Sequence, residues 1–183
     1  MKTEFEVVNV VCSGAIPSEN GINLEEVTDD LGYSSTEHGK SGKNIELENG
    51  TMILYETGKC IMHANNEEKL DKTQDEFVSA LANLGLEFDK EDFNFKINNF
   101  VGYGKLNRTI DLNKLTLALG LEDSEYEGEQ FSGLIYRGYP ISATFYSNGK
   151  VVLLGADSRE QIESVFYDMV VEDIQDISDR IGL

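Results

Sequence analysis

The stretch SATFYSNGKVVLLGA, residues 142–156, has a counterpart in TMILYETGKCIMHA, residues 51–64, in which Gly58-Lys59 falls on Gly149-Lys150. Two further pairs of segments match in the same order: VVNVVCSGAI (7–16) with INNFVGYGKL (97–106), and INLEEVTDDLG (22–32) with IDLNKLTLALG (110–120). A helical pattern follows each copy of the opening stretch. Because the order of elements is kept, we interpret the chain as a duplication, with a first repeat at 1–90 and a second at 91–183.

Both repeats predict the same elements in the same order. Alternation puts one set of side chains on a single strand face in each repeat: Phe5, Val7, Asn9 and Val11 in the first, and Phe95, Ile97, Asn99 and Val101 in the second. A short helix follows at 23–31 and at 111–119, with Asn or Asp as the N-cap and glycine as the stop. Glycine turns join the next strands, and a long amphipathic helix ends each repeat. The sequence therefore predicts an α/β (α+β) fold in which one long antiparallel sheet has helices on one face only.

The composition restricts the functional classes. The chain has 183 residues, of which 40% are hydrophobic, and a formal net charge of −19 at pH 7. Such a charge opposes non-specific binding to nucleic acid, although molar salt in the host would shorten the Debye length to about 3 Å. Cys12 and Cys60 lie in apolar runs without metal-ligand spacing, and the N-terminus lacks a signal-peptide pattern. We therefore expect a reduced, cytoplasmic protein.

The predicted open face of the sheet carries an unusual combination of side chains. Its expected members are Asn9, Val11, Ile61, Asn99, Val101 and Val152. An amide flanked by small apolar groups suits a surface that reads a groove with few acceptors, and the minor groove of A·T-rich DNA is such a groove. The alternative is that both asparagines are satisfied polar groups in an ordinary sheet.

One segment points to a known family. EYEGEQFSGLIYR (125–137), followed by SNGKVVLLGA (147–156), resembles the archaeal TATA-box-binding proteins, whose pattern is similar to Y-E-P-E-Q-F-P-G-L-I-Y-R and S-G-K-V-V-x-T-G-A-K. The resemblance covers roughly residues 5–182. It implies a saddle of two pseudo-symmetric halves, with one curved sheet and helices on the convex face. It also implies binding of A·T-rich promoter DNA in the minor groove, bending by inserted side chains, and recruitment of transcription factor B and RNA polymerase.

The resemblance implies roles for individual residues. Asn9 and Asn99 would hydrogen-bond base acceptors, and Phe131 would be a wedge, a side chain inserted between base steps. Its partner wedge would be Tyr146, or Phe145 if the alignment shifts by one. The full DNA-binding set is Asn9, Val11, Tyr55, Lys59, Ile61, Asn99, Val101, Phe131, Arg137, Tyr146, Lys150 and Val152, in which Lys59, Arg137 and Lys150 would contact phosphates. Glu127, Glu129 and Gln130 would hold transcription factor B.

The first repeat departs from the family pattern. Lys40 or Ser41 falls where a wedge phenylalanine is expected, and Glu46 falls where an arginine is expected. Lys40 and Lys43 would then supply substitute phosphate contacts. In both repeats a family threonine is replaced, by His63 in the first and by Leu154 in the second.

No motif indicates catalysis. We find no Ser-His-Asp grouping, zinc spacing or paired carboxylates in the sequence, and we read His38 as an ordinary surface histidine. We therefore expect a protein that is not an enzyme, uses no cofactor or metal, and binds promoter DNA as a monomer. The alternative is a diverged protein-binding module with weak or lost DNA binding. For single residues the plain readings are that Phe131 is core at the end of a strand and that Glu127 and Glu129 are ordinary solvated charges.

Overall fold

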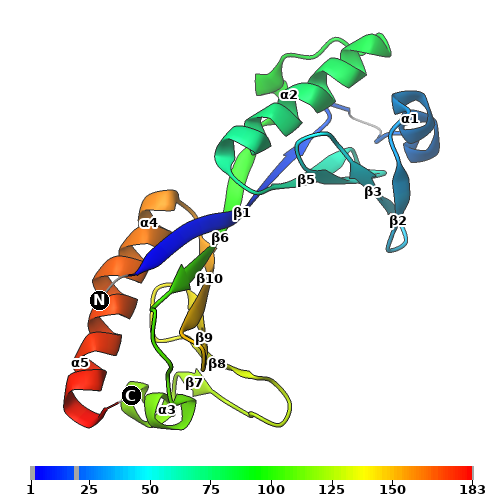
Figure 1. The fold of residues 1–183 in the computed structure, drawn as a ribbon. Helices are drawn as coiled ribbons and strands as arrows, with labels where there is room; N and C mark the ends of the chain where they lie inside the picture. The colour runs from blue at the N-terminus through cyan, green and yellow to red at the C-terminus, as the bar shows by residue number, and fades with distance from the viewer. Residues whose placement is uncertain (1–2, 19–20, 183) are drawn as a thin grey trace. The chain divides into compact units, whose positions relative to one another are not determined.

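The computed structural model describes residues 3–18 and 21–182, and the chain forms two units (Figure 1). We name the first the N-unit, Asn9–Asn98, and the second the C-unit, Met1–Val8 with Asn99–Leu183. The strand order of the antiparallel sheet is β2-β3-β4-β5-β1-β6-β10-β9-β8-β7. An α+β fold with one antiparallel sheet is therefore confirmed, while the division into repeats at 1–90 and 91–183 stays a prediction.

The N-unit contains a four-stranded meander beside the central strand. Its strands are β1 (Glu4–Ala15), β2 (Ser35–His38), β3 (Gly42–Glu46), β4 (Thr51–Tyr55) and β5 (Lys59–Ala64), and its helices are α1 (Leu24–Leu31), α2 (Glu67–Asn83) and the 3₁₀ turn η1 (Lys90–Phe93). Asn23 caps α1 by accepting from the Glu26 N–H, and Gly32 ends it with a φ of 70°. The predicted helix at 23–31 is thus confirmed together with its start and stop signals.

Helix α2 covers one face of the N-unit sheet (Figure 1). The buried residues on that side come from the helix and from two strands: Val10, Cys12, Cys60, Met62, Leu70, Phe77 and Leu81. The residues between them along the strands, Asn9, Val11, Ile61 and His63, remain partly exposed. One face is therefore core and the opposite face is open, as strand alternation predicts.

The C-unit has the same organisation. Its strands are β6 (Lys96–Lys105), β7 (Ser124–Glu125), β8 (Gly133–Tyr136), β9 (Ser142–Tyr146) and β10 (Lys150–Ala156), and its helices are α3 (Leu112–Leu119), α4 (Arg159–Ser164), the π-helical stretch η2 (Val165–Val170) and α5 (Val171–Ile181). Asp111 caps α3 by accepting from the N–H groups of Asn113 and Lys114. The long helix predicted at the end of the second repeat is present, but η2 interrupts its α-helical pattern.

Strand alternation fails at the two phenylalanines that begin the central strands. Phe5 was expected to share a face with Asn9, but its ring stacks on Phe166, with centroids 4.8 Å apart, on the covered side of the C-unit. Phe95 behaves alike in the N-unit, where it stacks on Phe93 at 5.3 Å. Each ring lies over a glycine of the neighbouring strand, Gly102 for Phe5 and Gly14 for Phe95, where a Cβ atom would collide with it. The absence of a Cβ atom on the glycine gives room for the ring. The free energy gained by packing the aromatic side chain exceeds the cost of departing from the regular alternation of the strand.

Within the described ranges, no helix combines the length and the apolar character needed to cross a membrane.

Candidate nucleic-acid interface

The open face of the N-unit is built from rows of side chains that run across its strands. Val11 of β1 pairs with His63 of β5, which in turn pairs with Thr51 of β4. A second row joins Ser13, Ile61, Ile53 and Asn44. These side chains are small, apolar or uncharged, so this face offers van der Waals contact and a few hydrogen-bonding groups.

The open face of the C-unit has matching rows. Leu154 of β10 lies between Val101 of β6 and Ser142 of β9 in the strand register. A second row joins Tyr103, Val152, Thr144 and Ile135. The predicted groove-lining residues Val101 and Val152 therefore lie on this open face, as Val11 and Ile61 lie on that of the N-unit.

The two predicted base-reading asparagines are held differently. The Asn99 Oδ1 atom accepts a hydrogen bond from the Gly155 N–H at 2.9 Å. Gly155 has a φ of 104° and lies at a register shift between Leu154 and Ala156, a β-bulge that only glycine accommodates easily. Because the backbone group is a donor, the amide oxygen must face it, and the Asn99 Nδ2 atom remains a donor for another partner.

The N-unit has no equivalent of this bulge in its central pair. β1 and β5 pair continuously from Val10 with Ala64 to Ala15 with Lys59. Among the residues that the structure describes, none forms a hydrogen bond with the Asn9 side chain. Asn9 therefore keeps both its oxygen acceptor and its nitrogen donor, whereas Asn99 offers only a donor.

An aromatic pair lies at the far end of the C-unit face. Phe131 is 44% exposed, and its ring stands edge-on to Tyr146 with centroids 6.1 Å apart. Gly133 pairs with Tyr146 in the register and lies beneath Phe131. Phe145, the alternative partner, is fully buried on the covered side. Phe131 is therefore not core, and Tyr146 rather than Phe145 is the residue beside it.

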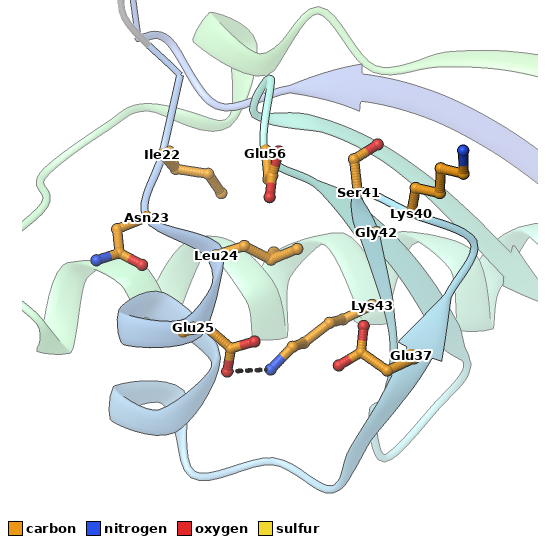
Figure 2. Close-up of a pocket in the computed structure, with 10 residues that line it drawn as sticks. All are labelled: Ile22, Asn23, Leu24, Glu25, Glu37, Lys40, Ser41, Gly42, Lys43 and Glu56. Carbon is orange, nitrogen blue, oxygen red and sulfur yellow. Dashed lines mark hydrogen bonds and ion pairs between the residues drawn. The ribbon is translucent and has the colours of Figure 1, made fainter.

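The N-unit has the same arrangement with a histidine in the place of phenylalanine. His38 stands edge-on to Tyr55 with centroids 6.1 Å apart, and Gly42 pairs with both residues. Neither Lys40 nor Ser41 takes the position expected for a wedge, because both line a pocket of about 380 Å³ between α1 and the β2–β3 hairpin (Figure 2). The alignment of the two repeats missed His38 because His38 precedes Gly42 by four positions, whereas Phe131 precedes Gly133 by two, and an alignment without gaps cannot express this difference. The register of that hairpin was the signal that could have revealed it.

Some of the lysine and arginine side chains near these faces already interact with other side chains. Lys59 is exposed, Lys150 Nζ lies 4.9 Å from the centroid of the Tyr103 ring, and Arg137 Nη1 lies 2.9 Å from Glu125 Oε2. Lys43 cannot be a substitute phosphate contact, because it is only 7% exposed and its Nζ binds Glu25 Oε2 at 2.5 Å beside α1 (Figure 2). That prediction is wrong for Lys43, since its side chain points to the covered side of the hairpin.

His63 is the ionisable group in the middle of the N-unit face. Burial lowers the pKa of its imidazole below the usual value of 6.5. The side chain is therefore neutral at pH 7 and has one nitrogen that donates and one that accepts.

The loop before β8 carries the predicted protein-binding residues. Glu127, Glu129 and Gln130 are all exposed. The Gln130 side chain donates to the Glu127 carboxylate, and the N–H of Phe131 donates to the Glu127 carbonyl at 2.9 Å. The loop is thus a closed turn that holds Phe131 at one end and leaves Glu129 in solvent.

Comparison with known proteins places this arrangement in a family. Residues 94–176 match the family model described as "Transcription factor TFIID (or TATA-binding protein, TBP)". TATA-box-binding protein C of Halobacterium salinarum is 37% identical over 169 residues, which cover 88% of this chain and 92% of that protein. The chain belongs to the TATA-box-binding protein family. A solved structure of the TATA-box-binding protein of Methanococcus jannaschii agrees, with a TM-score of 0.79 and 27% identity over 94% of this chain and 99% of that chain.

A further relative is similar over almost the whole length of both chains. The TATA-box-binding protein of Haloarcula marismortui is 28% identical and covers 96% of both chains, and it comes, like the Halobacterium protein, from a halophilic archaeon.

Proposed function

We propose that this protein is a transcription initiation factor that binds A·T-rich promoter DNA in the minor groove and bends it. The observation that supports it best is the pair of open faces, each of which combines apolar and uncharged polar side chains with an asparagine on its central strand. The minor groove of A·T pairs offers only acceptors, namely adenine N3 and thymine O2. The donor on Asn99 Nδ2, fixed by the Gly155 N–H, complements such an acceptor.

The wedges form the second part of the proposal. In the C-unit, Phe131 and Tyr146 would enter a base step, and in the N-unit His38 and Tyr55 would do so at another step. Inserting a side chain unstacks bases at a cost of a few kcal/mol per step, which the additional contact with bent DNA offsets. Phenylalanine enters a stack without losing a hydrogen bond, whereas imidazole and phenol carry polar atoms that need partners. We therefore expect the sharper kink at the C-unit end.

Phosphate contacts and partners complete the proposal. Lys59, Arg137 and Lys150 would contact the DNA backbone. The loop with Glu127, Glu129 and Gln130 would bind transcription factor B, and RNA polymerase would follow through that factor. The DNA-bound protein would act as a monomer in the cytoplasm, associated with the nucleoid.

Fluorescence anisotropy on a TATA-containing duplex and a G·C-scrambled duplex tests this function. The titration runs from about 0.1 to 3 M KCl, with and without transcription factor B. Selective binding at any salt concentration, weakened by Phe131→Ala, supports the proposal. Glu160→Gln on the exposed surface of α4 is a control for altered charge and should change nothing.

A second candidate is a protein-binding module that has lost DNA. Arg137, one of the cations proposed to contact phosphate, is already paired with the carboxylate of Glu125, which favours this alternative. Absence of binding at every salt concentration, with the partner present, would favour it over the first.

A further inference from the structure

The two open faces differ at one equivalent position. His63 lies between Val11 and Thr51 in the N-unit, and Leu154 lies between Val101 and Ser142 in the C-unit. In each unit the residue is on the strand next to the central one and beside the valine that follows the asparagine by two positions. A polar ring and an aliphatic chain therefore take the same place in the two halves.

At this place the C-unit has an aliphatic side chain, and the hydroxyl in its row, that of Ser142, has a counterpart in the Thr51 hydroxyl of the N-unit row. Leu154 is 49% exposed on the open face and forms no hydrogen bonds through its side chain. Asn99 has its oxygen bound to the Gly155 N–H and offers only Nδ2–H₂. A G·C pair differs from an A·T pair in the minor groove by the guanine N2 amino group, which is a donor. Against Leu154 and Asn99 that amino group would be desolvated without an acceptor, which costs free energy.

The N-unit presents acceptors at the same place. His63 is neutral at pH 7, because burial lowers its pKa, and one of its ring nitrogens accepts. Within residues 3–18 and 21–182, no hydrogen bond engages the side chain of His63 or of Asn9, so the Asn9 oxygen is a second acceptor. A guanine amino group facing this unit would find a partner.

We propose that His63 makes the N-unit accept a G·C pair in its half of the DNA site, whereas the C-unit requires A·T pairs. This inference rests on the proposed function and adds a sequence preference to it. A nearly symmetric A·T element cannot by itself dictate which unit lies on which half. One G·C pair placed off-centre would then fix the direction in which the protein sits on the promoter.

The test is a competition assay with a panel of duplexes. Each duplex carries one A·T to G·C replacement in an otherwise A·T-only element, and a second panel carries inosine·C instead. Inosine lacks the N2 amino group, so its minor groove resembles that of A·T. In the half that faces the C-unit we expect a G·C pair to weaken binding by roughly 5- to 150-fold, the usual effect of one mismatched pair. At the mirrored position in the other half we expect less than a two-fold change, and inosine·C should be tolerated in both halves.

Two reciprocal variants show which half of the DNA site faces which unit, and whether His63 is responsible for the tolerance of G·C. His63→Leu reproduces the C-unit residue and should introduce the G·C penalty in the tolerant half. Leu154→His should relieve the penalty in the other half. Glu160→Gln on α4, outside the open face, is the control and should leave the G·C pattern unchanged.

The outcomes separate this inference from the function on which it rests. Equal G·C penalties in both halves, with tight binding to the A·T element, would overturn the inference and leave the function standing. Tolerance of G·C that persists in His63→Leu would also overturn it. Absence of selective binding to any duplex would instead overturn the proposed function.

Discussion

The ring of Phe131 stands edge-on to that of Tyr146, and the ring of His38 stands in the same way to that of Tyr55, with centroids 6.1 Å apart in both pairs. The interplanar angles are 70° and 83°. The two units therefore keep one aromatic geometry while they change one ring from benzene to imidazole. This difference gives the proposed DNA complex a strong and a weak end.

Removal of Phe131 should weaken DNA binding more than removal of His38. We expect Phe131→Ala to lower the affinity for a TATA duplex about ten-fold, because it removes the apolar wedge that offsets unstacking. Bending, measured by energy transfer between dyes at the duplex ends, should fall with it. His38→Phe should increase the bend, and Phe131→Leu is the control for an apolar side chain without a ring. An unchanged bend in Phe131→Ala would show that the ring does not enter the DNA.

Release of Arg137 from Glu125 should strengthen the salt dependence of binding. In Glu125→Gln the guanidinium loses its carboxylate partner at 2.9 Å and becomes available for phosphate. Each added phosphate contact steepens the slope of log K against log salt by about 0.9. Arg137→Gln should flatten the slope by a similar amount. The control is Glu163→Gln, which changes the partner of Arg159 on α4. Identical slopes in all three variants would contradict a phosphate contact at Arg137.

The stability of the protein should fall as the pH decreases below about 6.5, in part because of His63. Burial lowers the pKa of His63 in the folded protein, so the unfolded chain binds the proton first as the pH falls. The stabilisation is complete above the unfolded pKa and is lost as the pH falls from there toward the folded pKa. Urea denaturation from pH 8 to 5 should show a smaller loss in His63→Leu than in the unmodified protein. His38→Leu controls for the removal of a histidine. If the free energy of unfolding depended on pH equally in His63→Leu and in the unmodified protein, His63 would not contribute to the pH dependence.

A methyl group at Gly104 should destabilise the C-unit. A Cβ atom there would lie 2.1 Å from Cε2 of Phe166, a ring that is fully buried. Overpacking of this kind costs about 1–3 kcal/mol, which thermal denaturation of Gly104→Ala would detect. Phe166→Leu introduced together with it should recover part of the loss, because the two positions share one space. Strictly additive effects would mean that the ring moves aside.

Much of the fold could be predicted from local signals. The caps Asn23 and Asp111, the stop at Gly32 and the apolar faces of the long helices depend only on residues close in sequence, and the structure confirms them. The placement of Val11 and Val101 on an open face followed from strand alternation alone.

Three features could not be predicted, because each depends on contacts between distant residues. Phe5 leaves its expected face because a glycine on another strand offers room for the ring. His38 meets Tyr55 through the hairpin register, which a gapless alignment cannot express. The hydrogen bond between Asn99 and Gly155 requires a β-bulge. The sequence hints at this bulge only because the stretch 142–156 is one residue longer than its counterpart, 51–64.

The crossing of Phe5 and Phe95 between the two predicted repeats bears on how the chain could have arisen. Phe5, from the first predicted repeat, stacks on Phe166 of the second, and Phe95, from the second, lies over Gly14 of the first. A single repeat would lack the ring that closes its own hydrophobic layer. It could obtain that ring only from another copy, so a one-repeat ancestor would have to be a strand-exchanged homodimer. Joining the two copies in one gene would have removed the dependence of dimer formation on protein concentration. Only after that step could the two halves acquire different residues, such as His63 and Leu154.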